Sequence, residues 1–445
     1  MDALLVLGVS HKTAPLALRE RLALPERRAA AFLMELLADA AIHEAVAIST
    51  CNRTEVYLFA ADPVGAEAAA LGALAAQAEM APTELAGSLY SRRGADAVRH
   101  LFEVAAGLDS MVIGEAEIQG QVKRAYQSAL VEGATGPLTN RLFRDAISTG
   151  KRVRSETGIG RSHVSVSSIA VELARATFGE LARRRVLVVG AGENGELTAE
   201  ALHRHGVESV FIANRRYDRA IGLAQRFGGV ALRLDDMPDE LVRSDIVVTS
   251  TNCPFPIIGR EELADVMDER EGRPLVMIDL AVPRDVEPEA RSIEGVTVID
   301  MDDLQEEAAS SLGARASESG VAREIVHAEV ERFSEWIAGL EAVPTIAALR
   351  DRGEQVVEHV LRENESRWES LSEADRERLG VMAHAIVSRL LHEPTMRLRG
   401  VGDGEASYIH VQALRDLFGL EPPPPMGEEE AAEVTSLEAR RRRRR

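Results

Sequence analysis

The chain has 445 residues, of which 45% are hydrophobic and 28% charged, and its formal net charge is -20. These values fit an ordinary soluble globular protein of about three domains, and the acidic balance taken alone argues against a nucleic-acid partner. No apolar stretch approaches the ~18 residues that span a membrane and the N-terminus lacks a signal-peptide pattern, so we expect a cytoplasmic protein.

The first region, residues 1–160, combines strand and helix patterns. Residues 3–9 alternate as a strand, and a helix is expected to begin at Leu24-Pro25-Glu26. Residues 44–50 and 55–60 predict two further strands, and helical apolar stripes follow them. The region is therefore predicted to be an α+β domain.

Cys51, one of only two cysteines, lies in the segment between those two strands. Its neighbours Thr50, Asn52 and Arg53 are polar, which is unlike a core setting, and a thiolate is a good nucleophile that leaves easily. A buried, inert thiol is the alternative interpretation. Cys253 ranks second because no cation lies beside it, and two cysteines so far apart predict neither a disulfide nor a metal site.

A basic cluster lies in residues 141–161, a stretch with few acids. A solvated helix face is the common explanation of such a cluster, although a local basic patch on an acidic protein can also dock RNA. Its members are Arg141, Arg144, Lys151, Arg152, Arg154 and Arg161.

The second region, residues 161–305, alternates short apolar strands with helices, which predicts a Rossmann-like, doubly wound parallel sheet. Its first strand leads directly into a G-x-G-x-x-G fingerprint and a helix. In this frame the fingerprint strongly favours a dinucleotide site, with the pyrophosphate at the helix N-terminus. The fingerprint residues are Gly190, Ala191, Gly192, Glu193, Asn194 and Gly195.

The end of the next strand indicates which dinucleotide is bound. An NAD enzyme usually carries an acid about 20 residues after the fingerprint, whereas this chain has Asn214-Arg215-Arg216. Because a guanidinium pairs well with a phosphate, Arg215 and Arg216 favour NADPH over NADH. The alternative is that both arginines are merely exposed.

The third region, residues 306–420, shows amphipathic helical stripes and no strand pattern. Such helices need a partner surface, and a second copy of the chain is the simplest candidate, so we expect a homodimer with an all-α dimerisation domain. Residues 421–445, which end in six arginines from Arg440 to Arg445, are predicted to be a disordered tail.

Taken together, these segments resemble the glutamyl-tRNA reductase family over about residues 1–420. The segments that carry the resemblance are Gly8 to Pro15, Ser49 to Glu55, Gly107 to Glu115, Gly150 to Arg154, the glycine fingerprint, and Leu390 to Thr395. The resemblance implies a catalytic domain, an NADPH domain and a helical dimerisation domain, in agreement with the three regions.

The resemblance also implies roles for single residues. Cys51 is the nucleophile, and His100, which lies off the apolar stripe of its helix and is structural by residue type alone, moves near the reacting centre. The sequence departs from the family at Ala116, at Glu117, where an amide is usual, and at Gln119, where a leucine is usual. The implied substrate pocket holds Thr50, Asn52, Arg53, Ser110, Glu115, Ala116, Glu117 and Gln121, with Arg53 as partner of the substrate carboxylate.

The implied reaction is the NADPH-dependent reduction of glutamyl-tRNA(Glu) to glutamate-1-semialdehyde through a cysteine thioester, the first committed step of tetrapyrrole synthesis. Glutamate-1-semialdehyde aminomutase is a further candidate partner. Two alternatives stay open: a shikimate-dehydrogenase-like NADP oxidoreductase that acts on a small alcohol, and an RNA-binding NADPH sensor without catalysis. The first leaves Cys51 and the helical third without a role.

Overall fold

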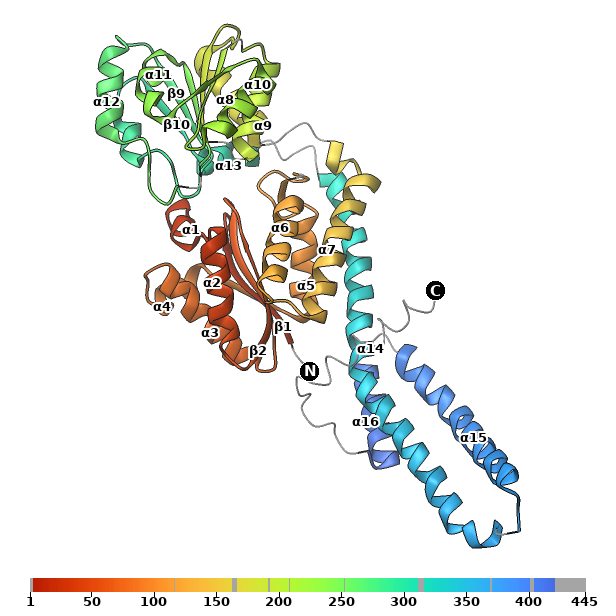
Figure 1. Cartoon of the computed structure of the whole chain (residues 1–445). Helices are drawn as coiled ribbons and strands as arrows, with labels where there is room; N and C mark the ends of the chain where they lie inside the picture. Colours follow the sequence, from red (N-terminus) through yellow and green to blue (C-terminus); the bar gives the residue numbers. More distant parts are fainter. Residues whose placement is uncertain are drawn as a thin grey trace. The chain divides into compact units, whose positions relative to one another are not determined.

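A computed structural model describes residues 3–115, 117–161, 166–190, 193–207, 209–251, 253–310, 316–368, 370–400 and 404–420. The chain forms two compact units, which divide between Val330 and Glu331. The first unit contains both sheets, and the second is built from helices (Figure 1).

The N-terminal part of the first unit is built on an antiparallel sheet with strand order β2-β3-β1-β4. Strand β3 is buried along its whole length, which requires cover on both faces of the sheet. Helices α2 and α3 cover one face, and α5, α6 and α7 lie on the other (Figure 1). The strands are β1 (Ala3–Ser10), β2 (Ile42–Ser49), β3 (Arg53–Ala60) and β4 (Tyr90–Arg93).

The helices of this part differ in length and in what they position. The longer ones are α2 (Glu26–Leu37), α3 (Pro63–Gln77), α5 (Gly94–Ala105), α6 (Glu117–Val131) and α7 (Pro137–Glu156). Two short helices complete the part, α1 (Leu16–Leu22) and α4 (Pro82–Leu85). Of these elements, α1 contacts β3 and α6 packs on β2, and these are the two strands that the Cys51 turn connects.

The second half of the first unit is a parallel sheet with strand order β10-β9-β8-β5-β6-β7. Successive residues of β5 belong alternately to two separate hydrophobic cores, because Val186 and Val188 face one layer of helices and Leu187 and Val189 face the other. The strands are β5 (Arg185–Val189), β6 (Ser209–Ala213), β7 (Val230–Leu232), β8 (Ile246–Thr249), β9 (Leu275–Asp279) and β10 (Val296–Ile299).

The chain leaves β5 toward β6 and β7 and then returns to β8 on the other side of β5, so the strand order reverses there. Ligands of doubly wound sheets bind at the carboxyl ends of the strands at such a point. The helices around this sheet are α8 (Val166–Phe178), α9 (Glu193–Arg204), α10 (Tyr217–Phe227), α11 (Met237–Arg243), α12 (Arg260–Glu269) and α13 (Met301–Ser310).

The second unit contains most of the long helix α14 (Ala316–Glu363), with α15 (Glu373–Gly400) and α16 (Gly404–Phe418). A small core of Ile346, Leu398 and Val411 joins the three helices. None of the helices that the structure describes is long and apolar enough to cross a membrane.

The sequence-based expectations for the elements around the two sheets are confirmed in the main. The strands on either side of Cys51 are present within a few residues, and so are the short apolar strands expected within residues 161–305. The sequence analysis missed β4, α1 and β7, which are short elements without a clear apolar period. The predicted tail at 421–445 lies outside the described residues.

Gly8 tests the close contact between β1 and β3. A Cβ atom at this position would lie 2.5 Å from the backbone oxygen of Thr54 and 2.8 Å from the Cα of Glu55. These are backbone atoms of a paired strand, so they cannot move away from the new methyl group as a flexible side chain could. We therefore expect Gly8→Ala to lower the free energy of unfolding by about 1–3 kcal/mol. Denaturant titration of the purified protein measures this change.

Gly72, inside α3, is the matched control, because a Cβ atom there meets no atom within 4 Å. Gly72→Ala is expected to leave stability unchanged or to raise it by up to about 1 kcal/mol. Equal stability of the Gly8→Ala variant and the wild type would contradict the packing described here.

Candidate functional site: the Cys51 pocket

The turn between β2 and β3 holds Cys51 in a fixed backbone frame. The Thr50 hydroxyl oxygen accepts the backbone N–H groups of Asn52 and Arg53, each at 3.2 Å, and the N–H of Thr50 donates to the carbonyl of Arg53 at 2.8 Å. The N–H of His11 donates to the carbonyl of Asn52 at 2.8 Å. The segment from Gly8 to Pro15 therefore braces the turn, and Cys51 is half-buried in it.

Behind the turn, Arg53 forms a buried ion pair with Glu55. The two side chains are 1% and 0% exposed, and Nη1 of Arg53 lies 2.6 Å from Oε1 of Glu55. The same nitrogen donates to Oδ2 of Asp109 at 3.1 Å, and Nη2 donates to the backbone carbonyl of Asp109. Both terminal nitrogens of Arg53 are thus engaged within the protein.

Glu55 accepts three further hydrogen bonds from different elements. Tyr57 and Tyr90 donate their hydroxyls at 2.6 Å each, and Nε2 of His100 donates at 2.9 Å. Burial would raise the pKa of the Glu55 carboxyl, but the charges of Arg53 and His100 and these hydrogen bonds outweigh it and hold the pKa below its usual range.

His100 is therefore placed differently from the expectation based on its helical position. It is 5% exposed rather than turned away from the core, because the carboxylate of Glu55 satisfies its ring. Its aromatic neighbour is Tyr90, at 5.3 Å between ring centroids. His100 is not among the residues that line the pocket at Cys51.

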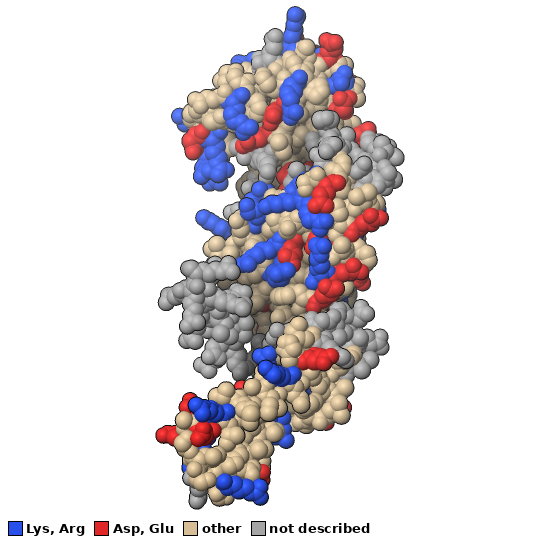
Figure 2. Space-filling view, turned by 90° about the vertical axis from the view of Figure 1, so that its right-hand side faces the viewer, with Lys and Arg blue, Asp and Glu red and all other residues tan. Residues whose placement is uncertain are grey.

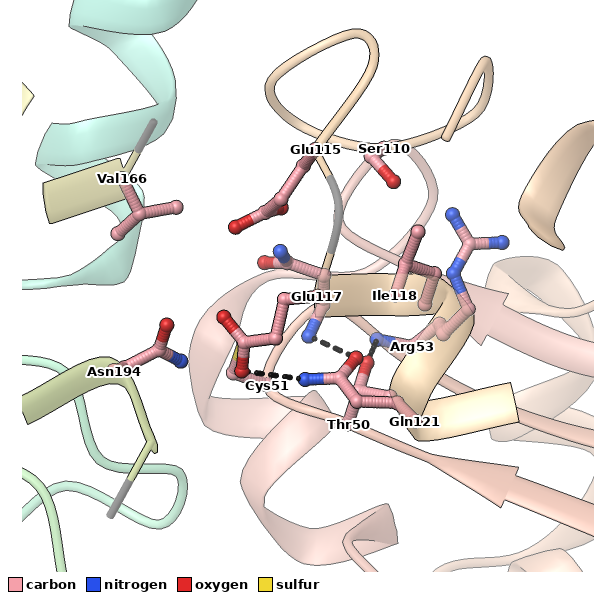
Figure 3. Close-up of a pocket in the computed structure, with 11 residues that line it drawn as sticks. Thr50, Cys51, Arg53, Ser110, Glu115, Glu117, Ile118, Gln121, Val166 and Asn194 are labelled. Carbon is pink, nitrogen blue, oxygen red and sulfur yellow. Dashed lines mark hydrogen bonds between the residues drawn. The ribbon is translucent and has the colours of Figure 1, made fainter. Parts of the chain in front are cut away.

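In front of the turn, a pocket brings together segments that are far apart in the sequence (Figure 3). Asn194 comes from the glycine fingerprint, and Val166 comes from α8. Seven of the eight expected substrate residues line this pocket, and the eighth, Ala116, lies outside the described residues. The remaining lining residues are Thr50, Cys51, Asn52, Arg53, Ser110, Glu115, Glu117, Ile118 and Gln121.

Two acids dominate the electrostatics of the pocket. Burial and the charge of Glu117 raise the pKa of Glu115 to about 8, so Glu115 holds a proton at neutral pH. Glu117 accepts a hydrogen bond from Nε2 of Gln121 at 2.9 Å. Glu117 thus places a carboxyl group beside the thiol.

Burial, followed by the charges of Glu117 and Glu115, raises the pKa of the Cys51 thiol. The cation that opposes this rise is Arg19 of α1, which sequence analysis did not identify. Arg19 is spaced three residues from Leu16 and from Leu22, both of which are buried. A charge on the apolar side of a short helix is the signal that could have identified it.

The glycine fingerprint has the geometry that its sequence predicts, where it is described. Gly190 has a φ of 98°, and a Cβ atom there would lie 2.5 Å from the carbonyl oxygen of Ser250. A Cβ atom on Gly195 would lie 2.9 Å from the side chain of Ser250, so this glycine allows α9 to pack on the sheet. Ala191 and Gly192 lie outside the described residues, and Glu193 begins α9.

Arg215 and Arg216 follow β6 after Asn214, and both are exposed. The backbone N–H of Arg216 donates to Oδ1 of Asn214 at 2.9 Å. Among the described residues, neither guanidinium has an ion-pair partner, so both can accept an anion. Cys253 lies after β8, outside the Cys51 pocket, with its N–H bonded to the Thr251 hydroxyl at 3.1 Å.

The basic cluster of residues 141–161, most of which lies in α7, is partly neutralised by acids. Arg141 pairs with Asp145, and Arg152 pairs with Glu156 and Glu329. Figure 2 shows Lys and Arg side chains interspersed with Asp and Glu side chains on one face of the molecule. These pairs favour a solvated helix face, and RNA docking by this cluster stays a prediction. Within the described parts of the chain, no group of three or more His, Cys, Asp or Glu side chains could hold a metal ion.

Models of known protein families match segments in each of the three regions of the chain. Residues 7–157 match the family model for the glutamyl-tRNA(Glu) reductase N-terminal domain, and residues 321–420 match the model for the dimerisation domain of the same enzyme. Residues 172–307 match the model named shikimate / quinate 5-dehydrogenase.

Full-length relatives agree with this assignment. The chain is 42% identical to the glutamyl-tRNA reductase of Geobacter metallireducens over 94% of this chain and 96% of that protein. It is 39% identical to the enzyme of that name from Magnetococcus marinus, over 94% and 99%. The solved structure of glutamyl-tRNA reductase from Methanopyrus kandleri is similar with a TM-score of 0.50 and 33% identity, covering 94% of this chain and all of that chain.

Glu117→Gln tests the influence of the acid pair on the thiol. Removing this charge lowers the pKa of Cys51, so the pH profile of alkylation by iodoacetamide should move to lower pH, with roughly tenfold more thiolate at neutral pH. Rates are measured in a Cys253→Ser background, where Cys51 alone reacts.

Glu132→Gln is the control, because Glu132 is exposed and follows the far end of α6. It should alkylate with the wild-type profile. An unchanged profile for Glu117→Gln would show that its carboxylate does not act on the thiol.

Proposed function

The chain belongs to the glutamyl-tRNA reductase family, and from this premise we propose that it reduces glutamyl-tRNA(Glu) to glutamate-1-semialdehyde with NADPH, the first committed step of tetrapyrrole synthesis. One observation carries the proposal: the half-buried thiol of Cys51 and Asn194 of the dinucleotide fingerprint line the same pocket. A nucleophile and a hydride-carrier site that share one pocket suit acyl capture followed by reduction.

In the first step, the sulfur of Cys51 attacks the ester carbonyl that links glutamate to the tRNA. A C–S bond forms and the C–O bond to the ribose breaks. The electron pair of that bond stays on the ribose oxygen, which receives a proton to give the free hydroxyl of the tRNA. The thioester that remains on Cys51 is more reactive toward reduction than an ester or an acid, because a thiolate is a good leaving group.

The thiol needs a base at neutral pH, since its surroundings raise its pKa. Glu117 lines the pocket together with the thiol, and its charge raises the pKa of Glu115, so Glu117 is the group placed to accept the thiol proton. The α-ammonium group of the glutamyl moiety also suits this pair of acids. Its binding there would offset the negative charge that disfavours the thiolate.

The nucleotide site fits NADPH. Gly190 and Gly195 permit the close approach of a pyrophosphate to the start of α9, and the exposed Arg215 and Arg216 stand where an NAD enzyme carries an acid. When bound, NADPH supplies the hydride for reduction of the thioester to the aldehyde. After the hydride adds to the carbonyl carbon, the C–S bond breaks to release the aldehyde, and the Cys51 thiolate takes up a proton to regenerate the thiol. Asn194, which lines the same pocket as Cys51, supports hydride delivery at this point.

The homodimer is supported by the second unit. Helices α14 and α15 expose large apolar side chains that the single chain leaves uncovered, and residues 321–420 match a dimerisation domain. These side chains are Val356, Val360, Val381, Met382, Ile386 and Leu390. Cytoplasmic localisation and a partnership with glutamate-1-semialdehyde aminomutase stay predictions.

Cys51→Ala tests the nucleophile. This variant should lose at least about a thousandfold in the rate of aldehyde formation from glutamyl-tRNA and NADPH, because no thioester can form. Cys253→Ala, the matched control at the other cysteine, should retain most of the activity, since Cys253 lies outside the pocket. Equal losses in both variants would reject Cys51 as the acyl carrier.

The double variant Arg215→Gln with Arg216→Gln tests the cofactor preference. A charged hydrogen bond to phosphate contributes about 1.5–3 kcal/mol, so kcat/KM for NADPH should fall tenfold or more while the value for NADH changes little. Steady-state kinetics with both cofactors measure the ratio. A wild type that uses NADH as well as NADPH would contradict the proposed preference.

A further inference from the structure

Arg19 connects the Cys51 turn to the nucleotide-binding half of the first unit. Its side chain is only 2% exposed, and its two terminal nitrogens have different partners. Nη1 donates to the backbone carbonyl of Cys51 at 2.6 Å, and Nη2 pairs with Oδ1 of Asp302 at 2.5 Å. Asp302 lies in the first turn of α13, directly after the last strand of the parallel sheet.

The rest of α1 strengthens this connection. The backbone N–H of Leu16 donates to Oδ2 of Asp302 at 3.4 Å. The carboxylate of Glu20 accepts three hydrogen bonds of 2.8 Å from Arg284, two from the Arg284 guanidinium and one from the Arg284 backbone N–H. The cation is on α1 in one pair and on the nucleotide-binding half in the other, so the two pairs fix one orientation of the contact.

Of the α1 side chains that form these contacts, Arg19 is the one that bonds to Cys51. The side chain of Arg53, adjacent in sequence, is turned toward Glu55 and Asp109 instead. A guanidinium held near a thiol favours the thiolate, and here it opposes the effect of Glu117 and Glu115. A bond to the Cys51 carbonyl also restricts the rotation of that peptide, and thereby the direction of the Cα–Cβ bond.

We propose that Arg19 is a positioning residue for acyl capture: through Cys51 it orients the thiol, and through Asp302 it makes that orientation depend on the docked nucleotide-binding half. The inference rests on the proposed function, in which Cys51 is the acyl carrier and the second half delivers the hydride. Its consequence is that the thiol is most reactive when the part that must complete the reaction is in place. Exposure of a thioester to water without a reductant is thereby reduced.

The test uses the full chain in a Cys253→Ser background and follows iodoacetamide alkylation of Cys51 as a function of pH, which requires no tRNA or cofactor. Arg19→Met should shift the profile to higher pH and lower the alkylation rate at neutral pH about tenfold or more. Asp302→Ala should shift it in the same direction by a smaller amount, because Arg19 keeps its charge but loses its second anchor. Arg21→Met is the control, since Arg21 is exposed on the same helix and its side chain donates to the carbonyl of Glu79, away from Cys51.

Arg19→Lys separates charge from geometry. Lysine keeps the cation but cannot bridge two partners as a guanidinium does, so it should restore much of the alkylation profile and leave the rate of acylation by glutamyl-tRNA reduced. Because Asp302 is 47% exposed, Asp302→Ala tests the same bridge if Arg19→Met does not fold.

The proposal is overturned if both Arg19→Met and Asp302→Ala alkylate with the profile of Arg21→Met. It is also overturned if a folded Arg19→Met variant alone keeps the wild-type profile. Failure of the proposed function is a separate result: aldehyde formation would persist in Cys51→Ala, whatever the alkylation profiles of the Arg19 variants show.

Discussion

The buried carboxylate of Glu55 is the constraint on which the Cys51 site depends. An ionised group without solvent is costly unless its oxygens are fully satisfied, and here Arg53, Tyr57, Tyr90 and His100 all donate to it. These donors come from β3, β4 and α5, so one carboxylate unites a strand with its neighbours in the fold. Arg53 extends the network to Asp109, in the segment that leads to the acids of the pocket.

The network divides the turn into two sides with different tasks. On the inner side, Arg53 and His100 bind the buried carboxylate of Glu55, and Arg53 also forms an ion pair with Asp109. On the outer side, Cys51 faces Glu115, Glu117 and the fingerprint residue Asn194. Because the Glu55 network holds the turn in one conformation, the thiol can meet a substrate without the entropic cost of ordering a loop at each turnover.

Local sequence patterns were sufficient for the parts of the site that depend on neighbouring residues. The turn at Cys51 follows from two strand-like segments separated by polar residues, and the fingerprint from a strand, three glycines and a helix. Residues expected from the family resemblance in the pocket do line it, apart from Ala116, which is not described, and His100, expected near the reacting centre, which lies behind the turn. Whether they bind substrate stays a prediction.

Partners that are distant in the sequence could not be predicted in this way. The direction of the Arg53 side chain depends on Asp109, 56 residues later, and the role of Arg19 depends on Asp302, 283 residues later. His100 is spaced off the apolar stripe of α5, so only the position of Glu55 on a different element explains its burial. Charge on an apolar face indicates a buried partner, but the sequence does not say which one.

The most direct test of this account is hydrogen exchange in Glu55→Gln. Glutamine keeps the shape of the side chain but removes the charge, which leaves Arg53 buried without its main counterion. We predict that the amides of residues 50–53 lose protection from exchange. We also predict that acylation of Cys51 by glutamyl-tRNA, measured by intact-protein mass spectrometry, slows by at least about tenfold. Amides of β5 and β8 should exchange as in the wild type. Wild-type protection at residues 50–53 together with wild-type acylation would contradict the claim that the Glu55 network builds the site.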